Sequence, residues 1–335
     1  IWTQATFVDD DTLLLWNSAG GTWQWYDVRI RAATPFAYDP VGLLQVAGVD
    51  PDDGRVLVSE YNGEGVLTLL RKGQTEVHRI AHGRAAWGRL MPHGAMLLGV
   101  GDGRLLAMTD SGPPREIAKL DGTVEAAVGL EGSGFAALSS QGELVRGDLA
   151  TGALVRTRVP PGTTSTLAGD RAGRVLVAQD NHLLLWDRDL AEIARPDKRI
   201  VRIEPIDGGA LLELADHAMV RSSLAAGAPL TTLLAPSSRS PLVSRDGKLV
   251  VGESTNGRVA AVETATGAAW DLPAYYQGRD LATISPTARR FVQLGYGELA
   301  LWTLPLAPAD LRRWLTERTN AVTDGDYALS WSWQP

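Results

Sequence analysis

The sequence contains no cysteine, which excludes disulfide bonds, thiol catalysis, cysteine-ligated zinc and iron–sulfur clusters. No stretch approaches the ~20 consecutive apolar residues that a membrane-spanning helix needs, so we expect no membrane span. Runs of five or six like charges are also missing, and a charged tail is not expected. What is present is a hydrophobic fraction of 44%, which is ample for a buried core and excludes wholesale disorder.

The charge balance disfavours one class of partner. The formal net charge is −7 at pH 7, and charges of both signs are scattered along the chain. A general binder of the phosphate backbone needs a basic face. We therefore expect no general nucleic-acid binding, although a local basic patch stays possible on these numbers.

One pattern recurs eight times along the chain: an apolar run, a turn rich in Gly, Asp or Pro, a second run, a second turn and a third run. A period of about 40 residues is typical of the four-stranded blades of a β-propeller. Because such units stack by addition, the length does not imply two domains. The first turns are centred on Asp9–Asp11, Pro51–Gly54, Pro92–Gly94, Glu131–Ser133, Asp170–Gly173, Asp207–Gly209, Arg245–Gly247 and Pro286–Ala288.

The local patterns favour β-strands over residues 1–305. Repeat one places the Gly20-Gly21 hairpin signal between the runs Leu13–Trp16 and Thr22–Tyr26. Runs such as Arg174–Ala178 are apolar without alternation, which is typical of strands covered on both faces. Helical periodicity is absent from these residues, so the fold class is all-β.

Eight inner strands predict eight blades, and seven blades, the commoner ring, stay the alternative. Repeat eight lacks a fourth strand after Trp302, which leaves an open sheet edge. The expected inner strands are Gln4–Val8, Leu43–Val49, Ala85–Leu90, Val124–Leu130, Thr164–Ala168, Ile200–Ile206, Pro241–Ser244 and Leu281–Ser285.

Residues 306–335 change character and are expected to form a separate C-terminal helix and strand packed on the propeller. Pro308 and Asp310 are helix-start signals, and an apolar stripe follows from Leu311 to Leu315. The alternation in Tyr327–Trp333 predicts a strand. We expect this strand to dock on an open edge, such as that of the eighth blade.

Several residues resemble the WD-repeat family of β-propellers over residues 1–305. These are the Ser285-Pro286 turn, the Trp186-Asp187 pair that ends a third strand, and the variants Tyr26-Asp27 and Trp302-Thr303. The Gly-His dipeptide of that family is missing, and other propellers, such as the quinoprotein-like group, have similar periods. The segment Asp310–Ala321 resembles the C-terminal ends of propellers in bacterial STAND NTPases and serine/threonine kinases.

In the propellers that this chain resembles, partners bind to the loops between second and third strands and between blades. Aromatic and arginine residues anchor such surfaces. For Trp16 and Trp87, a core position between blades is the alternative, whereas Tyr275 and Tyr276 are adjacent and cannot both easily face the core. The predicted partner-binding residues are Trp16, Tyr61, Arg84, Trp87, Arg89, Tyr275, Tyr276, Arg279 and Tyr296.

No motif assembles an enzyme site, so we predict no catalytic residue, no metal and no cofactor. The five histidines are dispersed, and no Gly-x-Ser-x-Gly elbow occurs on a strand–helix turn. The paired carboxylates of Asp9–Asp11 and Asp52-Asp53 lie at turns, where Asp bonds to its own backbone.

The function predicted is therefore a non-enzymatic recognition module whose propeller face binds a protein, a peptide or a small ligand, with a protein or peptide as the favoured partner. It would be the sensor or scaffold of a larger bacterial signalling or effector protein, with an upstream effector domain of the same polypeptide as one possible partner. We expect a cytoplasmic location and interpret the start at Ile1-Trp2-Thr3 as a truncated or processed end. One alternative is a propeller enzyme (a lactonase, lyase or glycan hydrolase) with carboxylates or histidines converging at the channel mouth. Another is a structural scaffold in a secreted or envelope assembly.

Overall fold

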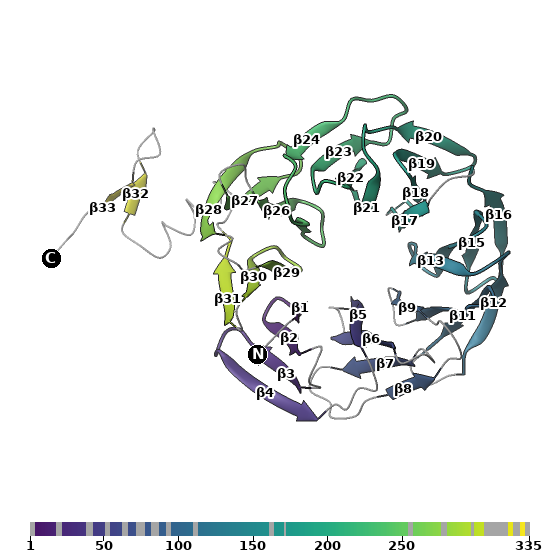
Figure 1. The fold of residues 1–335 in the computed structure, drawn as a ribbon, viewed down its shortest axis with the longest axis horizontal. Helices are drawn as coiled ribbons and strands as arrows, with labels where there is room; N and C mark the ends of the chain where they lie inside the picture. The colour runs from purple at the N-terminus through teal and green to yellow at the C-terminus, as the bar shows by residue number, and fades with distance from the viewer. Residues whose placement is uncertain are drawn as a thin grey trace.

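The chain forms a ring of eight β-sheets around a central opening (Figure 1). The computed structural model describes residues 4–17, 22–37, 43–50, 54–61, 66–71, 78–81, 87–91, 95–109, 113–160, 164–170, 172–253, 257–275, 280–295, 298–304, 321–323 and 329–331. Every regular element within these ranges is a β-strand. None of the described residues forms a helix that could cross a membrane. The prediction of an all-β fold with eight blades is confirmed, and the seven-blade alternative is wrong.

Each blade is an antiparallel sheet in which consecutive strands pair, with its first strand beside the opening. The eight predicted inner strands all overlap the first strand of a blade. The first four blades contain β1 (Gln4–Asp9), β2 (Thr12–Trp16), β3 (Thr22–Asp27) and β4 (Ala32–Ala37); β5 (Leu43–Asp50), β6 (Arg55–Tyr61), β7 (Val66–Arg71) and β8 (His78–Ala81); β9 (Trp87–Leu90), β10 (Met96–Gly99), β11 (Arg104–Met108) and β12 (Arg115–Lys119); and β13 (Val124–Gly129), β14 (Gly134–Ser139), β15 (Glu143–Asp148) and β16 (Leu154–Arg158).

Blades 5 to 7 repeat this arrangement, and the sheet of blade 8 has three strands within the described ranges. They contain β17 (Thr164–Gly169), β18 (Val175–Gln179), β19 (His182–Trp186) and β20 (Leu190–Ala194); β21 (Ile200–Ile206), β22 (Gly209–Leu214), β23 (Met219–Ser223) and β24 (Thr231–Leu234); β25 (Leu242–Val243), β26 (Leu249–Glu253), β27 (Arg258–Glu263) and β28 (Ala269–Tyr275); and β29 (Asp280–Ile284), β30 (Arg290–Gly295) and β31 (Glu298–Thr303).

The turn signals of the sequence mark positions where the backbone needs positive φ or close approach. Gly247, in the first hairpin of blade 7, has φ of 69°, and a Cβ atom there would lie 2.3 Å from Cγ2 of Ile206 in blade 6. Ser244 stabilises the same hairpin, because its Oγ accepts a hydrogen bond of 2.9 Å from the backbone N–H of Leu249. Glycine therefore serves both the turn and the packing of adjacent blades.

The hydrophobic core lies between neighbouring blades. All five residues of β18 are buried, as expected for a strand covered on both faces. At the seam between blades 5 and 6, Leu183 and Ile193 pack with Ile200 and Leu212, and all four are at most 4% exposed. Burial of apolar surface, at roughly 25 cal/mol per Å², is the main stabilising term at each seam.

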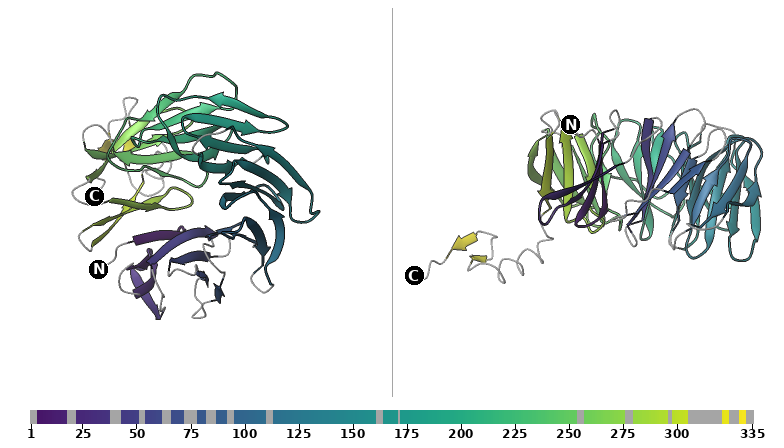
Figure 2. Two further views of the ribbon diagram at one scale, coloured as in Figure 1. Left: turned by 45° about the vertical axis from the view of Figure 1, so that its right-hand side comes forward. Right: turned by 90° about the horizontal axis from the view of Figure 1, so that it is seen from below.

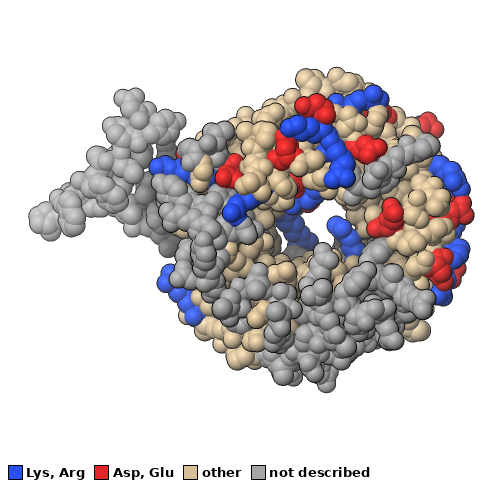
Figure 3. All heavy atoms as spheres, viewed as in Figure 1, with Lys and Arg blue, Asp and Glu red and all other residues tan. Residues whose placement is uncertain are grey.

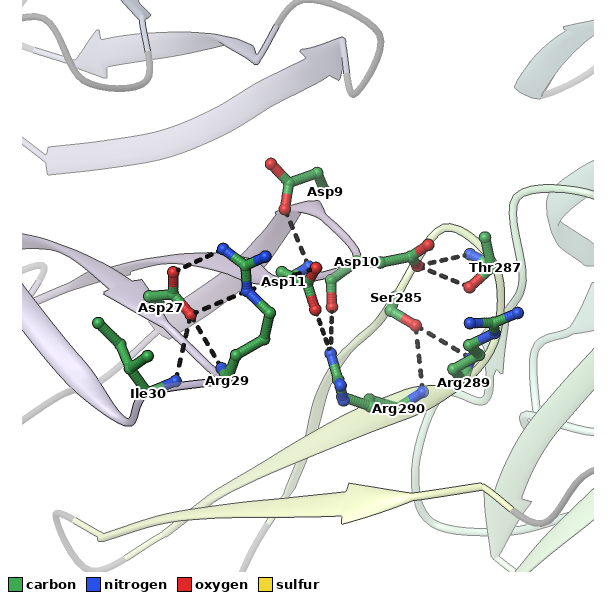
Figure 4. Close-up of polar contacts among 10 residues, drawn as sticks. All are labelled: Asp9, Asp10, Asp11, Asp27, Arg29, Ile30, Ser285, Thr287, Arg289 and Arg290. Atoms are coloured by element: carbon green, nitrogen blue, oxygen red, sulfur yellow. Dashed lines mark hydrogen bonds and ion pairs between the residues drawn. The ribbon is translucent and has the colours of Figure 1, made fainter. Parts of the chain in front are cut away.

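The seam between blades 8 and 1 closes the ring without a shared strand among the described residues. Nη1 of Arg290 lies 2.7 Å from Oδ1 of Asp11 and donates to the carbonyl oxygen of Asp10 at 2.7 Å (Figure 4). Thr287 donates its backbone N–H and its hydroxyl to Oδ1 of Asp10, at 3.0 and 2.8 Å. Side chains near the N-terminus therefore hold the last blade in place.

The C-terminal residues that the structure describes form a hairpin, which Figure 2 shows to one side of the ring. Strand β32 (Ala321–Thr323) pairs with β33 (Leu329–Trp331). The strand expected over Tyr327–Trp333 thus forms in part, and its partner is β32, whereas docking on the eighth blade was expected. The predicted helix after Pro308 lies outside the described residues.

Candidate recognition site at the central channel

The central opening remains open when all heavy atoms are drawn, and basic side chains reach into it (Figure 3). The inner strands line this channel. Strand β21 contributes Arg202 and Glu204, which are two residues apart and therefore on the same side of the strand. Strand β9 of blade 3 contributes Arg89, which is exposed. The channel wall at blades 3 and 6 therefore carries charges of both signs.

A buried carboxylate anchors the blade 6 side of the site. Glu213, on β22, is 3% exposed, and its Oε2 lies 3.1 Å from Nε of Arg202. This contact is an ion pair without hydrogen-bond alignment. Oε1 of Glu213 lies 2.8 Å from Nδ1 of His217. The buried charge is therefore paired on both oxygens, as burial requires.

The same network joins blade 6 to the loop that leads into blade 7. Nη2 of Arg202 donates to the carbonyl oxygen of Pro241 at 2.5 Å, and Oγ of Ser240 lies 3.2 Å from Nδ1 of His217. His217 belongs to the hairpin between β22 and β23 and has φ of 62°. The loops concerned are a second-to-third-strand loop and an inter-blade loop, which form the face where partner binding was expected.

Glu204 is a titratable carboxyl on the channel wall. Desolvation raises its pKa, the positive charges of Arg202 and Arg89 oppose that rise, and the negative charge of Glu213 adds to it. Its side chain keeps 43% of its surface accessible, so the carboxyl meets channel water while protein surrounds it. The charge of Arg89 on blade 3 therefore influences the carboxyl of Glu204 on blade 6.

The geometry limits the chemistry of this cluster. Ser240 and Glu213 both contact Nδ1 of His217, whereas a nucleophilic triad places the serine and the carboxylate on opposite ring nitrogens. Within the described ranges, no three His, Asp or Glu side chains gather closely enough to hold a metal ion. The arrangement is suited to fixing charges at the channel wall.

The structure describes the side chains of two of the nine predicted partner-binding residues. Trp16 is 3% exposed and stacks on Trp23 with ring centroids 5.4 Å apart, so it occupies the core position considered as the alternative. Its ring presents almost no surface to a partner. Arg89 is exposed and lies on the channel wall. Three further predicted residues lie on strands, but the structure does not describe their side chains: Tyr61, Trp87 and Tyr275. The remaining four lie outside the described residues: Arg84, Tyr276, Arg279 and Tyr296.

Sequence reasoning missed four residues of this site. Arg202 and Glu204 stand on a predicted inner strand, where a charged pair interrupts an apolar pattern. Glu213 lies within the apolar run of β22, and His217 follows it in the next hairpin. A carboxylate inside a buried strand was the available signal, because such a group requires a partner.

Comparisons with known proteins support the fold alone. No protein-family profile matches the chain, and no curated protein matches it. The computationally designed Ika8 protein shares 14% identity with a TM-score of 0.68, covering 90% of this chain and 96% of its own. The β-propeller domain of Cps50 (Swd1) from Myceliophteria thermophila has 14% identity and a TM-score of 0.50, covering 75% and 93%. Hydrazine synthase from Kuenenia stuttgartiensis has 13% identity and a TM-score of 0.53, covering 91% and 96%.

Proposed function

We propose that the ring is a non-enzymatic recognition module that binds an acidic segment of a protein partner at the channel mouth. Arg89 carries this proposal. Its side chain is exposed on an inner strand, and no described residue forms a hydrogen bond or ion pair with it. A guanidinium presents five N–H donors in a geometry that matches a carboxylate.

The network around Arg202 supports recognition because it holds the Arg202 guanidinium in one position. Arg202 is held by Glu213 and by the carbonyl oxygen of Pro241. Such pre-organisation lowers the entropy cost of binding, since the receptor side chains are already ordered. Arg89 is then a described cation at this wall that remains open to a partner's carboxylate.

The accessibility of the two glutamates also favours recognition over hydrolysis. A glycan hydrolase needs two carboxyl groups that both reach the scissile bond. The side chain of Glu213 is only 4% exposed and is engaged by Arg202 and His217, so Glu204 is the accessible carboxyl of this pair.

In the broader setting, the module would sense or scaffold for an effector. The resemblance of Asp310–Ala321 to the C-terminal ends of propellers in bacterial STAND NTPases and serine/threonine kinases motivates this part of the proposal. The acidic segment would then belong to another protein or to an effector domain of the same polypeptide, in the cytoplasm. Sequencing the complete reading frame tests this setting, and an NTPase or kinase domain upstream is the expected result.

A propeller enzyme is the second candidate, and the raised pKa of Glu204 is the observation that favours it. A carboxyl that stays protonated can act as a general acid. Lactone and p-nitrophenyl glycoside hydrolysis by the chain and by its Glu204→Gln variant distinguish the two functions. Turnover that disappears in Glu204→Gln would replace the recognition proposal.

An array of acidic and basic decapeptides, followed by fluorescence anisotropy of the best binders, tests the recognition proposal. We expect the chain to prefer acidic peptides, and Arg89→Ala to weaken their binding about tenfold. Arg188→Ala is the matched control, because Arg188 is also exposed and lies in the turn between β19 and β20. Equal binding by the chain and Arg89→Ala, or no preference for acidic peptides, would contradict the proposal.

A further inference from the structure

We propose that the open pocket between blades 3 and 4 binds a small amphiphile with an apolar body and one carboxylate. The pocket has a volume of about 600 Å³, within the range of small-molecule sites. The first and third hairpins of these blades surround it. Because successive turns of an antiparallel meander alternate between the two ends of the strands, it lies on the face opposite the channel-mouth site. It therefore extends beyond the proposed peptide recognition.

The lining has the chemistry of an amphiphile site. Its wall includes Met91, Met108, Pro113 and Leu149, and Arg115 is the single charged residue among the described residues of the lining. Nη2 of Arg115 donates to the carbonyl oxygen of Leu149 at 3.2 Å. Its other N–H groups have no acceptor among the described residues. Methionine side chains adapt to apolar ligands, and one cation at the rim selects an anionic head group.

A nearby carboxylate does not compete for Arg115. Asp148 accepts hydrogen bonds from Oγ of Ser133 at 2.6 Å and from the backbone N–H groups of Thr151 and Ala150 at 2.8 and 2.9 Å. The Ser133 bond, followed by the backbone bonds, lowers the pKa of Asp148. Asp148 thus forms its hydrogen bonds within its own turn. The guanidinium of Arg115 is therefore available to pair with the carboxylate of a ligand.

Strand register identifies a position at which this seam carries a small residue. On each third strand, one residue at the equivalent register faces the next blade. In blade 3 it is Ala107, which pairs with Leu97, and in blade 6 it is Arg221, which pairs with Leu211. From blade 1 to blade 8 the residues at this position are Trp25, Leu69, Ala107, Arg146, Leu185, Arg221, Ala261 and Leu301.

Large side chains at this position reach into the following blade. Nη1 of Arg221 donates to the carbonyl oxygens of Thr264 and, at 2.6 Å, of Ala265 in blade 7. The guanidinium of Arg146 lies 5.1 Å from the ring centroid of Trp186 in blade 5. In each case the side chain contributes its own atoms to the seam.

Only two of the eight positions are alanine, and their neighbours differ. Ala261 pairs with Trp270, whose ring packs against the core between blades 7 and 8. Ala107 pairs with Arg115, which bonds to the carbonyl oxygen of Leu149. In blade 3 the partner of the alanine is therefore an exposed arginine, whereas in blade 7 it is a packed tryptophan, and the pocket lies at the blade 3 seam.

Methionine methyl NMR tests this site directly, because the chain has 4 methionines. Met91 and Met108 line the pocket, whereas Met219 is fully buried in blade 6 and serves as the internal control. Titration of the chain with decanoate should shift the Met91 and Met108 signals in a saturable way and leave Met219 unchanged. Decanol should bind about tenfold more weakly than decanoate, as expected for one lost charge-assisted bond, and decylamine should not bind.

Variants separate the pocket from non-specific binding. Ala107→Arg reproduces the residue of blade 6, where the equivalent pocket is smaller at about 420 Å³, and should weaken binding and reduce the shifts. Ala107→Met is a smaller filler if the arginine variant does not fold. Arg115→Gln should bind decanoate and decanol equally. The proposal is overturned by three results: no saturable shift up to about 1 mM decanoate, equal shifts at Met219, or shifts unaffected by every filled variant.

Discussion

Two arginine-centred networks join neighbouring blades, and they differ in the burial of their carboxylates. Arg202 links blade 6 to the blade 7 loop and pairs with Glu213, whose side chain is 4% exposed. Arg290 links blade 8 to blade 1 and pairs with Asp11, whose side chain is 36% exposed. Water can replace the partner of Asp11 and cannot easily reach Glu213. Of these two networks, the channel network is therefore expected to matter more for stability, while the closing network adds to apolar packing.

The largest loss of stability is expected from a substitution in the channel network. Arg202→Met should destabilise the ring by about 3 kcal/mol, because it leaves a buried carboxylate with His217 as its remaining partner. The measurement is the unfolding temperature by circular dichroism at pH 7. The double variant Arg202→Met with Glu213→Gln is the control and should recover most of the loss, since it also removes the buried charge.

At the closing seam the same change should cost much less. Arg290→Met is expected to destabilise by about 1 kcal/mol, because Asp11 stays hydrated and apolar contacts hold the seam. Those contacts include Phe7 of blade 1 and Val292 of blade 8, which are 4% and 0% exposed. Hydrogen exchange should show faster opening of β1 and β30 with little change in β18. A loss as large as that of Arg202→Met would remove the distinction between the two networks.

A fully peripheral network should give the smallest effect. On β20, hydrogen bonds from Arg195 and His182 lower the pKa of Glu192 to about 2. Because the folded-state pKa lies below the ordinary 4.5, the stabilisation is present above pH 4.5 and is lost as the pH falls toward 2. Glu192→Gln should cost a few tenths of a kcal/mol at pH 7, because Glu192 is 37% exposed and water screens its charge. Thermal scans of both proteins at pH 7 and pH 3 should show this difference shrinking at the lower pH.

The sequence predicted the architecture because repeats, turn residues and apolar runs are local signals. The eight inner strands followed from these signals. The channel site did not follow, since Arg89 and Glu204 belong to different blades, and only the closed ring places the Arg89 charge near enough to oppose the rise in the pKa of Glu204. For Trp16 the sequence left a core position and a partner contact open, because its burial depends on stacking against Trp23 and the next blade. Likewise, Ala107 is unremarkable within its own repeat. It stands out as a small residue only when the register of all eight blades is compared.

The most direct test of recognition at the channel is the affinity for an acidic peptide between pH 8 and pH 5, where the peptide's own carboxylates stay ionised. Ionised Glu204 partly neutralises Arg89, and its raised pKa brings protonation closer to this window. The chain should therefore bind more tightly as the pH falls. Glu204→Gln should bind tightly throughout with most of this slope removed, whereas His217→Gln should retain the slope. A pH-independent affinity in the unaltered chain, or the same slope in Glu204→Gln, would contradict a site built on Arg89 and Glu204.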